Sequence, residues 1–303
     1  MITQKLNSES TTALALGNFD GLHLAHMAVL CKTLETAKEK GLVPAVLLFD
    51  EHPKQVLEGK RPPRIMTDEA RDELLSDMGF KIIKVSFDDL RNTSPEDFLL
   101  NVHCRFNVRA ICCGFNYHYG KNASGTVQTL KKSCEKLGIT LCAVDEVSFE
   151  KEPISSTRIR HEIENGNIEK ANQMLGREFS YKIEVASGDR RGRLLGFPTI
   201  NQFFPENFVT ARFGVYASKV KLSDKWYPAV TNIGVRPTIN TKSLRSETCI
   251  LGFKGDLYGM KIEVFLLSFI REEKKFSSLE ELRQAMENDA EKAKEIYKKG
   301  MIL

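Results

Sequence analysis

The sequence predicts two domains: an α/β domain built on a mostly parallel sheet, then a mainly antiparallel β-barrel domain with a C-terminal helix. Three observations support this prediction. The length of 303 residues suits two domains of ordinary size. Strand-like and helix-like segments alternate from residue 12 to about 145, which is typical of a sheet covered by helices. From Tyr181 onward strand-like segments follow one another, so we place the domains at residues 1–180 and 181–303.

The first domain combines short apolar runs with recognisable helix starts. Thr67 can cap one helix, and Ser94 with Pro95 begins another that has acidic residues in its first turn. A third helix is expected over about 126–137, and two more, ending at Gly176, lead into the second domain. The expected strands are Thr12–Leu16, Val43–Phe49, Lys81–Phe87, Val108–Cys113 and Ile139–Val144.

The second domain shows strand-like runs separated by Gly, Asn, Asp and Pro. These runs are Lys182–Ala186, Gly214–Leu222, Trp226–Ile233, Glu247–Phe253 and Met260–Phe269. A capping box over residues 277–280 then starts a final helix that runs to about Lys298. The residues expected on the inward face of that helix are Leu279, Leu282, Met286 and Ala293.

The composition is that of a globular protein, with 42% hydrophobic and 28% charged residues. A net charge of +4 predicts no broad nucleic-acid surface but suits small polyanionic substrates such as nucleotides. No run of about 18 apolar residues occurs, so we expect no membrane span. Seven scattered cysteines, with Cys112 and Cys113 expected to be buried, and an N-terminus without an apolar signal core fit a cytoplasmic protein. The sequence does not specify an oligomeric state.

A loop bracketed by glycines joins the first strand to the first helix. His23 and His26 lie three residues apart, on one face of the first helical turn. A helix start with two imidazoles suits a polyphosphate, while packing inside the fold is the alternative reading of the pair. The expected nucleotide-binding residues of this loop are Gly17, Asn18, Phe19 and Asp20.

Two further polar positions, His52 and Asn116, follow the second and fourth predicted strands. Ligands of parallel sheets bind beyond the carboxyl ends of the strands, so we expect both side chains in the pocket of the two histidines. The alternative is that they only satisfy turns. Further along, hydroxyls and arginines at a helix start suit phosphate binding, although a capped helix with solvated arginines has the same pattern. These residues are Ser156, Thr157, Arg158 and Arg160.

The stretch 187–201 of the second domain is read as a loop rich in glycine and basic residues, which suits a second polyphosphate. Thr199 and Asn201 offer neutral oxygen ligands for a hard cation such as Mg²⁺. The spacing differs from a Walker loop, so the pattern alone does not identify a kinase. The other candidate nucleotide contacts are Gly188, Arg193, Gly196 and Pro198.

Several motifs in a fixed order carry a family resemblance over about residues 12–298. They are Gly17–His23, Ile154–Arg160, Gly196–Asn201, Asn232–Thr238, Glu247–Thr248, Asp256–Gly259 and Ile270–Glu273. The first of them resembles the nucleotide-binding motif of the nucleotidylyltransferase superfamily. The whole order resembles the bacterial bifunctional riboflavin kinase/FMN adenylyltransferase (FAD synthetase) family.

The resemblance implies a nucleotidylyltransferase-like, Rossmann-like first domain that converts FMN to FAD, and a barrel that phosphorylates riboflavin to FMN. Both reactions would use ATP with Mg²⁺. It implies Glu247 as the base of the kinase and Thr199 with Asn201 as the Mg²⁺ and phosphate ligands. It also implies that His23 and His26 stabilise charge on the α-phosphate, chemistry that depends on positioning and charge neutralisation. The remaining implied residues are Ser156, Thr157, Arg158 and Arg160 for the ATP phosphates, with Arg158 counted as catalytic, His52 and Asn116 for the pocket, and Asn116, Arg271 and Glu273 for the flavin.

Three positions depart from the family pattern: Ala25 replaces the Gly of His-x-Gly-His, Glu51 replaces a Pro, and Cys249 stands where His or Tyr is common. Two of these positions lie in the implied adenylyltransferase site. A riboflavin kinase with a weakened adenylyltransferase site is therefore the second hypothesis. A flavin- or nucleotide-binding sensor without turnover is the third, and an intact Glu247 argues against it because binding alone needs no base.

Overall fold

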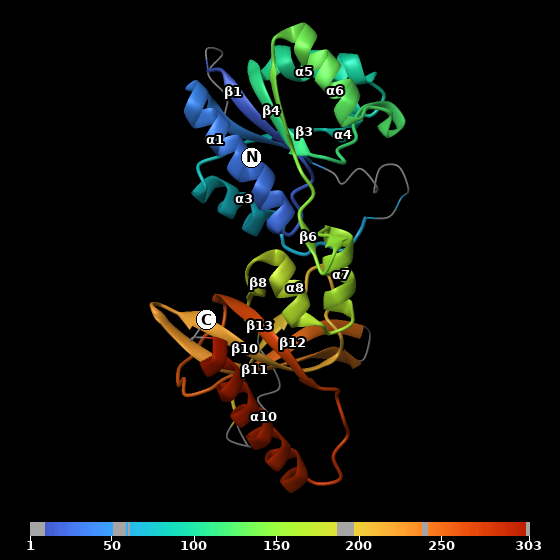
Figure 1. The fold of residues 1–303 in the computed structure, drawn as a ribbon. Coiled ribbons are helices and arrows are strands. Elements are labelled where there is room, and N and C mark those ends of the chain that lie inside the picture. The colour runs from blue at the N-terminus through green and yellow to red at the C-terminus, as the bar shows by residue number, and fades with distance from the viewer. Residues whose placement is uncertain (1–9, 51–58, 60, 187–196, 238–241, 301–303) are drawn as a thin grey trace. The chain divides into compact units, whose positions relative to one another are not determined.

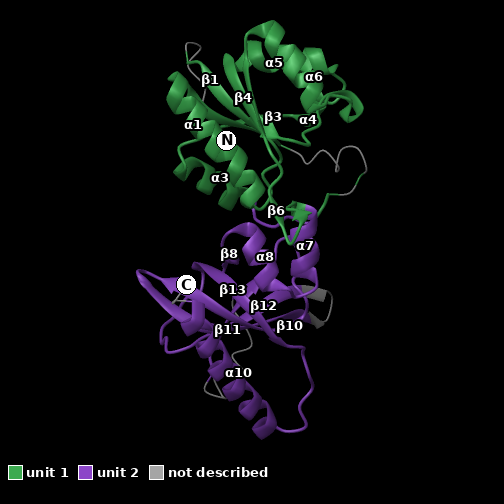
Figure 2. Cartoon of the chain, in the orientation of Figure 1, with its two compact units in different colours: residues 1–62, 68–156 green, residues 63–67, 157–303 purple. Residues whose placement is uncertain are grey.

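The computed structural model describes residues 10–50, 59, 61–186, 197–237 and 242–300. The chain divides into two compact units (Figure 2). Unit 1 comprises residues 1–62 and 68–156, and unit 2 comprises residues 63–67 and 157–303. The predicted domain boundary at 180/181 differs from the boundary between the units, which follows Ser156, and it stays a prediction. Helices α7 (Ser156–Glu164) and α8 (Ile168–Leu175) account for most of the residues between the two boundaries.

Unit 1 contains a five-stranded parallel sheet in the order β3-β2-β1-β4-β5 (Figure 1), which confirms the predicted α/β fold. Each expected strand is present within two residues of its predicted ends. The strands are β1 (Thr12–Leu16), β2 (Val43–Phe49), β3 (Lys81–Val85), β4 (Val108–Gly114) and β5 (Thr140–Val144). A small hairpin of β6 (Ser148–Phe149) and β7 (Glu152–Pro153) follows them.

The third strand stops before its predicted end at Phe87. Ser86 precedes a short helix, α4 (Phe87–Leu90), whose first turn carries Asp88 and Asp89. Acidic residues in a first turn favour a helix start over strand continuation, so local helix signals override the apolar Phe87.

Helices α1 (Leu24–Lys40) and α3 (Asp68–Asp77) cover one face of this sheet, and α5 (Pro95–Phe106) and α6 (Val127–Leu137) cover the other (Figure 1). The short 3-10 turn η1 (Lys121–Ala123) precedes α6. The predicted caps are present, since Ser94 accepts a hydrogen bond from the Asp97 amide at 3.0 Å.

Strand β1 alternates between these two faces, as strand geometry requires. Leu14 and Leu16 join the cluster that includes Phe98 and Leu130 of α5 and α6. Ala13 packs with Ala37 of α1 on the opposite face. The strand thus presents a small residue to α1 and large residues to α5 and α6, and all five of its residues are buried.

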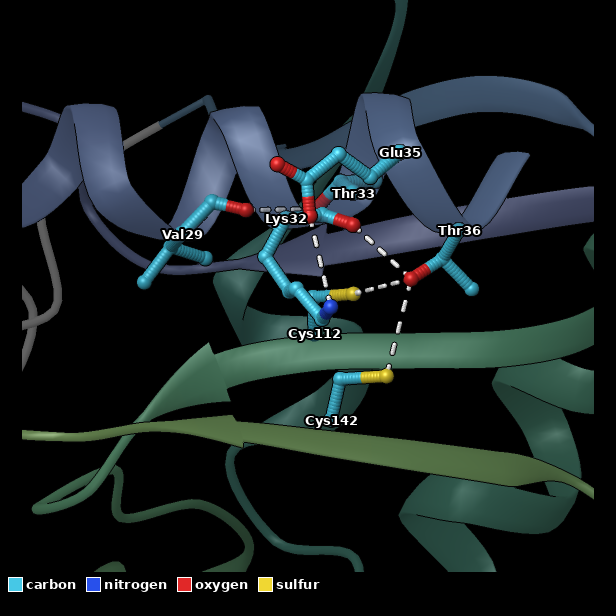
Figure 3. A network of polar contacts seen from close by, with 7 residues as sticks. All are labelled: Val29, Lys32, Thr33, Glu35, Thr36, Cys112 and Cys142. Atoms are coloured by element: carbon cyan, nitrogen blue, oxygen red, sulfur yellow. Dashed lines mark hydrogen bonds and ion pairs between the residues drawn. The ribbon is translucent and has the colours of Figure 1, made fainter. Parts of the chain in front are cut away.

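The α1 face also contains a seam of hydroxyl and thiol groups (Figure 3). Thr36 donates to the Lys32 carbonyl at 2.8 Å and lies 3.6 Å from the Cys142 sulfur and 3.9 Å from the Cys112 sulfur. Burial raises the pKa of the Cys112 thiol to about 11 and that of Cys113 to about 12, so both stay protonated near neutral pH. The expected burial of this cysteine pair is confirmed, and its thiols serve packing.

Unit 2 is built on a six-stranded antiparallel sheet in the order β8-β13-β10-β11-β12-β9. Ala186 donates its amide to the Asn201 carbonyl at 2.8 Å, which brings the two edge strands together and curls the sheet toward a barrel. Helix α10 (Leu279–Gly300) packs on β10, β11 and β13. The strands are β8 (Phe179–Glu184), β9 (Thr199–Phe203), β10 (Gly214–Leu222), β11 (Lys225–Pro237), β12 (Lys242–Ile250) and β13 (Lys261–Arg271). The predicted antiparallel second half is thus confirmed.

Two expectations for this unit are corrected. Thr199 and Asn201 lie on strand β9, and the loop reading of this stretch is wrong for them. The strand predicted over Glu247–Phe253 is β12, which begins earlier and ends at Ile250, before a turn with Gly252 at a φ of 79°. Only glycine adopts that left-handed conformation without strain, so the turn ends the strand.

The final helix has the predicted cap one residue later than expected. Ser278 accepts a hydrogen bond from the Glu281 amide at 3.1 Å. Leu279, expected to face inward, is 71% exposed because it begins the helix, where the chain has not yet reached the sheet. The buried residues of the helix are Asp289, Ala290 and Ala293. Within the described residues, no helix is long and apolar enough to cross a membrane.

Candidate active sites

The first candidate site lies at the carboxyl end of β1 in unit 1. Leu16, the last residue of β1, is paired with Cys113 of β4, so Gly17 and Gly114 follow at neighbouring strand ends. Strands β2 and β3 lie on one side of β1 in the sheet, and β4 and β5 lie on the other, so the strand order reverses direction at β1. Such a switch point of a parallel sheet is where ligands of this fold class bind.

The loop after β1 has an unusual backbone. Phe19 has a φ of 51° and Leu22 a φ of 40°, and both side chains are buried. Left-handed conformations of non-glycine residues cost of order 1–3 kcal/mol each and occur often at ligand sites. A Cβ on Gly17 would lie 3.1 Å from the Phe19 ring, so the glycine leaves room for that ring. Phe19 was expected to contact the nucleotide, but its full burial places it beneath the loop.

The two histidines of the loop lie together. His23 precedes α1 as its N-cap and accepts a hydrogen bond from the His26 amide at 3.3 Å. Their rings stack with centroids 3.6 Å apart, and the Phe19 ring lies 5.2 Å from that of His26. Two stacked imidazoles beside a helix N-terminus offer N–H donors to an anionic group.

Other predicted residues of this site are only partly brought together. Ser156 donates a hydrogen bond to the Asp20 carbonyl at 2.9 Å, which ties the start of α7 to the histidine loop. The Asn116 side chain folds back toward Gly114. Its oxygen lies 3.6 Å from the position that a Cβ on Gly114 would occupy. Thr157, Arg158 and Arg160 belong to unit 2, where Arg160 donates to the Pro63 carbonyl at 2.6 Å. His52 and Glu51 lie outside the described residues.

The second candidate site is a row of side chains across three strands of unit 2. Asn232 of β11 is paired with Glu247 of β12, and Glu247 is paired with Asn201 of β9. Directly opposite residues of antiparallel strands project from the same face, so the carboxylate lies between two amides. The Glu247 side chain is 29% exposed and accessible to a substrate.

The opposite face of the same strands fixes this register. The Ser218 and Thr231 hydroxyls lie 2.7 Å apart, and those of Thr231 and Thr248 lie 2.9 Å apart. All three residues are fully buried. Because Thr248 follows Glu247 directly, this chain of buried hydroxyls holds β12 in the register that presents the carboxylate.

Charged groups surround the row. The Arg245 Nη2 lies 2.5 Å from Oε1 of Glu247. Asn232 donates a side-chain hydrogen bond to Glu273 at 2.8 Å. The Glu273 carboxylate fills the space beside Gly234, since a Cβ on Gly234 would lie 2.6 Å from Oε1 of Glu273. Glu273 thus lies beside Asn232 in this cluster, and its flavin contact stays a prediction.

Arg271, the other predicted flavin contact, is engaged elsewhere. Its guanidinium binds the buried carboxylate of Asp289 through Nε at 3.1 Å and Nη2 at 2.7 Å. This two-point ion pair fixes α10 on the sheet. Its flavin contact stays a prediction.

Two cavities adjoin on either side of Pro198. The smaller, of about 290 Å³, includes Thr199, and the larger, of about 680 Å³, includes Cys249, the residue opposite Thr199 on β12. Glu247 lies two residues from Cys249 on the same face, about 7 Å along the strand. Arg271, Glu273 and Glu247 line neither of these two cavities.

Sequence reasoning missed part of the wall of the larger cavity. Burial raises the pKa of the Cys249 thiol to about 11, so this wall is uncharged at that point. The other missed residues lie just before β9, in the turn after β12 and on one stripe of α10. They are Phe197, Phe253, Lys254, Gln284, Glu287, Asn288, Glu291 and Lys294. The helical spacing of the last five was visible, but polar residues at that spacing are usually a solvated face.

The donor set of β9 fits Mg²⁺ that arrives with a nucleotide. The described residues contain no cluster of three or more His, Cys, Asp or Glu side chains suited to a metal. Thr199 and Asn201 supply two oxygen donors from one face of a strand. Mg²⁺ usually keeps several waters and takes its other ligands from phosphates, so few protein donors suffice. Gly188, Arg193 and Gly196 lie outside the described residues.

Comparisons with known proteins cover nearly the whole chain. A family model described as FAD synthetase matches residues 5–158, and one described as Riboflavin kinase matches residues 175–297. Proteins named Bifunctional riboflavin kinase/FMN adenylyltransferase are 33% identical in Bacillus subtilis and 35% identical in Listeria monocytogenes, covering 94% of this chain and 92% of each relative. A crystal structure described as a macrolide-efflux protein from Streptococcus pneumoniae matches with a TM-score of 0.86 and 28% identity over 96% of each chain.

Proposed function

Since the chain belongs to the bifunctional riboflavin kinase/FMN adenylyltransferase family, we propose that each of its two reactions is carried out by one compact unit. The protein is an enzyme of flavin-nucleotide synthesis, which phosphorylates riboflavin to FMN and adenylylates FMN to FAD. The efflux activity named for the similar crystal structure corresponds to neither family model. The proposed location is the cytoplasm, which seven free thiols support.

The kinase reaction is assigned to unit 2, and the row Asn201–Glu247–Asn232 is the observation that carries the assignment. Glu247 accepts the proton of the ribityl hydroxyl as that oxygen bonds to the γ-phosphorus of ATP. The bond from the γ-phosphorus to the bridging oxygen breaks, and ADP leaves. Thr199 and Asn201 would hold Mg²⁺, which supplies charge neutralisation to the phosphates.

The two adjoining cavities suit the two substrates of this kinase. The larger cavity has Phe197, Phe253 and Cys249 in its wall, an apolar surface suited to the isoalloxazine ring. The smaller cavity contains Thr199, the proposed Mg²⁺ and phosphate ligand, and shares Lys254 with the larger one, which suits the phosphates of ATP. Both volumes lie near or within the range of small-molecule sites.

The adenylyltransferase reaction is assigned to unit 1, and the stacked histidine pair supports this. A phosphate oxygen of FMN bonds to the α-phosphorus of ATP, and pyrophosphate leaves with the electrons of the broken P–O bond. His23 and His26 stabilise the charge on the α-phosphate, and Asn116 contributes to the flavin side of the pocket. Ser156 is the predicted ATP-phosphate ligand that belongs to unit 1, whereas Thr157, Arg158 and Arg160 belong to unit 2 and their contact with the ATP phosphates stays a prediction.

One incubation tests the whole proposal. The protein is supplied with riboflavin, ATP and Mg²⁺, and the flavins are separated by chromatography. FAD is the expected product, FMN alone would indicate a kinase only, and unchanged riboflavin would contradict both activities. A second incubation with FMN in place of riboflavin isolates the adenylyltransferase, and chelation of Mg²⁺ is expected to stop both reactions.

A further inference from the structure

We propose that Arg245 is a positioning residue for Glu247, holding one carboxylate oxygen so that the other faces the ribityl hydroxyl. The inference rests on the proposed kinase function of unit 2. Nothing in the sequence motifs singled out Arg245, which lies two residues before Glu247 on β12 and on the same face.

Arg245 and Glu247 form a close ion pair, without hydrogen-bond geometry. Arg245 Nη2 lies 2.5 Å from Oε1 of Glu247. Arg245 is paired with Gly234 of β11 on one side and with Phe203 of β9 on the other. The backbone that carries Arg245 is thus fixed by strand pairing on both sides. Arg245 lies two residues before Glu247 along β12.

The flanking amides do not perform this task. Asn232 donates its side-chain N–H to Glu273 at 2.8 Å. Among the described residues, neither Asn232 nor Asn201 makes a side-chain hydrogen bond to Glu247. Arg245 is therefore the side chain that holds this carboxylate before substrate binds, through the charge attraction of an ion pair.

Burial makes the restraint stiff. The Arg245 side chain is 10% exposed, whereas the side chain of its carboxylate partner is 29% exposed. A buried guanidinium needs a counter-charge, and Glu247 supplies it. The guanidinium is also planar and loses little freedom per contact, so it fixes a carboxylate better than a lysine does.

The restraint assigns different roles to the two carboxylate oxygens. Oε1 is engaged by Arg245, and Oε2 accepts the ribityl proton while the new O–P bond forms and the bridging P–O bond of ATP breaks. Misplacement of a catalytic group by about 1 Å can cost on the order of 10²-fold in rate. Loss of Arg245 should therefore lower kcat and leave substrate binding nearly intact.

The test is a double-mutant cycle in the full chain with Arg245→Gln, Glu247→Gln and the double variant. Arg245→Gln is expected to lower kcat for riboflavin phosphorylation about 10- to 10²-fold, with KM for riboflavin and ATP within about threefold. In the Glu247→Gln background the same change should have no further effect, because the group it positions is gone. Arg245→Lys should recover part of the loss.

Two controls separate positioning from damage to the fold. Formation of FAD from FMN reports on unit 1 and should be unchanged. Arg212→Gln removes the arginine of an exposed ion pair with Glu272 in the same unit and should leave kcat unaltered. If Arg245→Gln is insoluble, the cycle is repeated with Arg245→Lys, for which a parental kcat would overturn the proposal.

The contrary outcomes are distinct. An equal loss from Arg245→Gln in both backgrounds would mean that Arg245 acts through the fold, and a raised KM at constant kcat would mean that it binds substrate. Either result overturns the inference and leaves the kinase assignment in place. Full turnover by Glu247→Gln would instead remove the proposed base, and the inference with it.

Discussion

The two candidate sites of this enzyme are assembled in opposite ways. In unit 1, one continuous segment, the loop after β1 and the first turn of α1, supplies the glycines, the buried Phe19 and the histidine pair. In unit 2, Asn201, Asn232 and Glu247 come from three strands and meet only through pairing register. The first site depends on local backbone conformation, and the second depends on register, where a slip of one residue would turn Glu247 to the opposite face.

The largest effect is expected from Glu247→Gln, which tests whether the register-built site contains a single essential group. The change keeps the side-chain shape and removes the base, so kinase turnover should fall about 10²- to 10⁴-fold while riboflavin and ATP still bind. Flavin products are measured by chromatography and binding by calorimetry. FAD formation from FMN, carried by unit 1, should be unchanged. Turnover within a few-fold of the parent would assign Glu247 a structural role.

Phe19→Ala tests the loop-built site, where conformation is held by packing beneath the histidines. Removing a fully buried ring typically costs about 3–5 kcal/mol and would release His26 from its neighbour. FAD formation should fall on the order of 10²-fold, and riboflavin phosphorylation should persist. Phe19→Leu, which keeps most of the volume, should unfold at a temperature between those of the parent and Phe19→Ala. A folded Phe19→Ala protein with parental FAD formation would contradict the positioning of His26 by this ring.

The loop-built site could be predicted from the sequence more completely than the register-built site. The loop and its helix start were found from sequence because cap, glycine and histidine signals lie within ten residues of one another. Strand β9 was missed because it is short, follows Pro198 and gains its hydrogen bonds from β12, far along the chain. Non-local pairing leaves little trace in local composition.

Cavity walls were also beyond sequence reasoning. The α10 stripe that includes Gln284 and Asn288 has the pattern of a solvated face, and only the packing of α10 on the sheet turns it toward a cavity. Arg271 shows the converse. Its motif suggested a flavin contact, which stays a prediction, and only the structure reveals that its guanidinium pairs with Asp289.

Two fragments test how far the register-built site stands alone. Residues 157–303 keep α8, whose Asn172 donates to the Leu266 carbonyl at 3.0 Å and accepts from the Phe179 amide at 2.7 Å. Residues 180–303 begin at the predicted boundary and lose both bonds, each worth about 1 kcal/mol, together with the buried side chains of α8.

We expect the longer fragment to fold and phosphorylate riboflavin, and the shorter one to unfold at a lower denaturant concentration. Both lack residues 63–67, so the comparison tests residues 157–179, which comprise most of α7, all of α8, Glu178 and the first residue of β8, Phe179. Equal midpoints in urea would place the functional boundary at 180/181.

The smallest effect is expected from Ala25→Gly, which restores the family pattern between the two histidines. Ala25 is the second residue of α1 and is half-buried, and in the proposed site its methyl group would face the nucleotide at the helix start. Removing it allows a closer approach of the α-phosphate, and FAD formation from FMN should rise a few-fold, well below the roughly 10²-fold that a full 1 Å displacement costs.

The Ala25→Gly change should also lower the stability of helix α1, and this loss of stability provides a control. Glycine within a helix is about 1 kcal/mol less favourable than alanine, although less is lost at a first turn than in the interior. The thermal midpoint of unit 1 should therefore fall slightly while adenylylation rises, a combination that a general improvement in folding would not produce. Riboflavin phosphorylation serves as the internal reference. Unaltered FAD formation would show that the methyl group is clear of the nucleotide, and that the loop-built site tolerates this departure without loss.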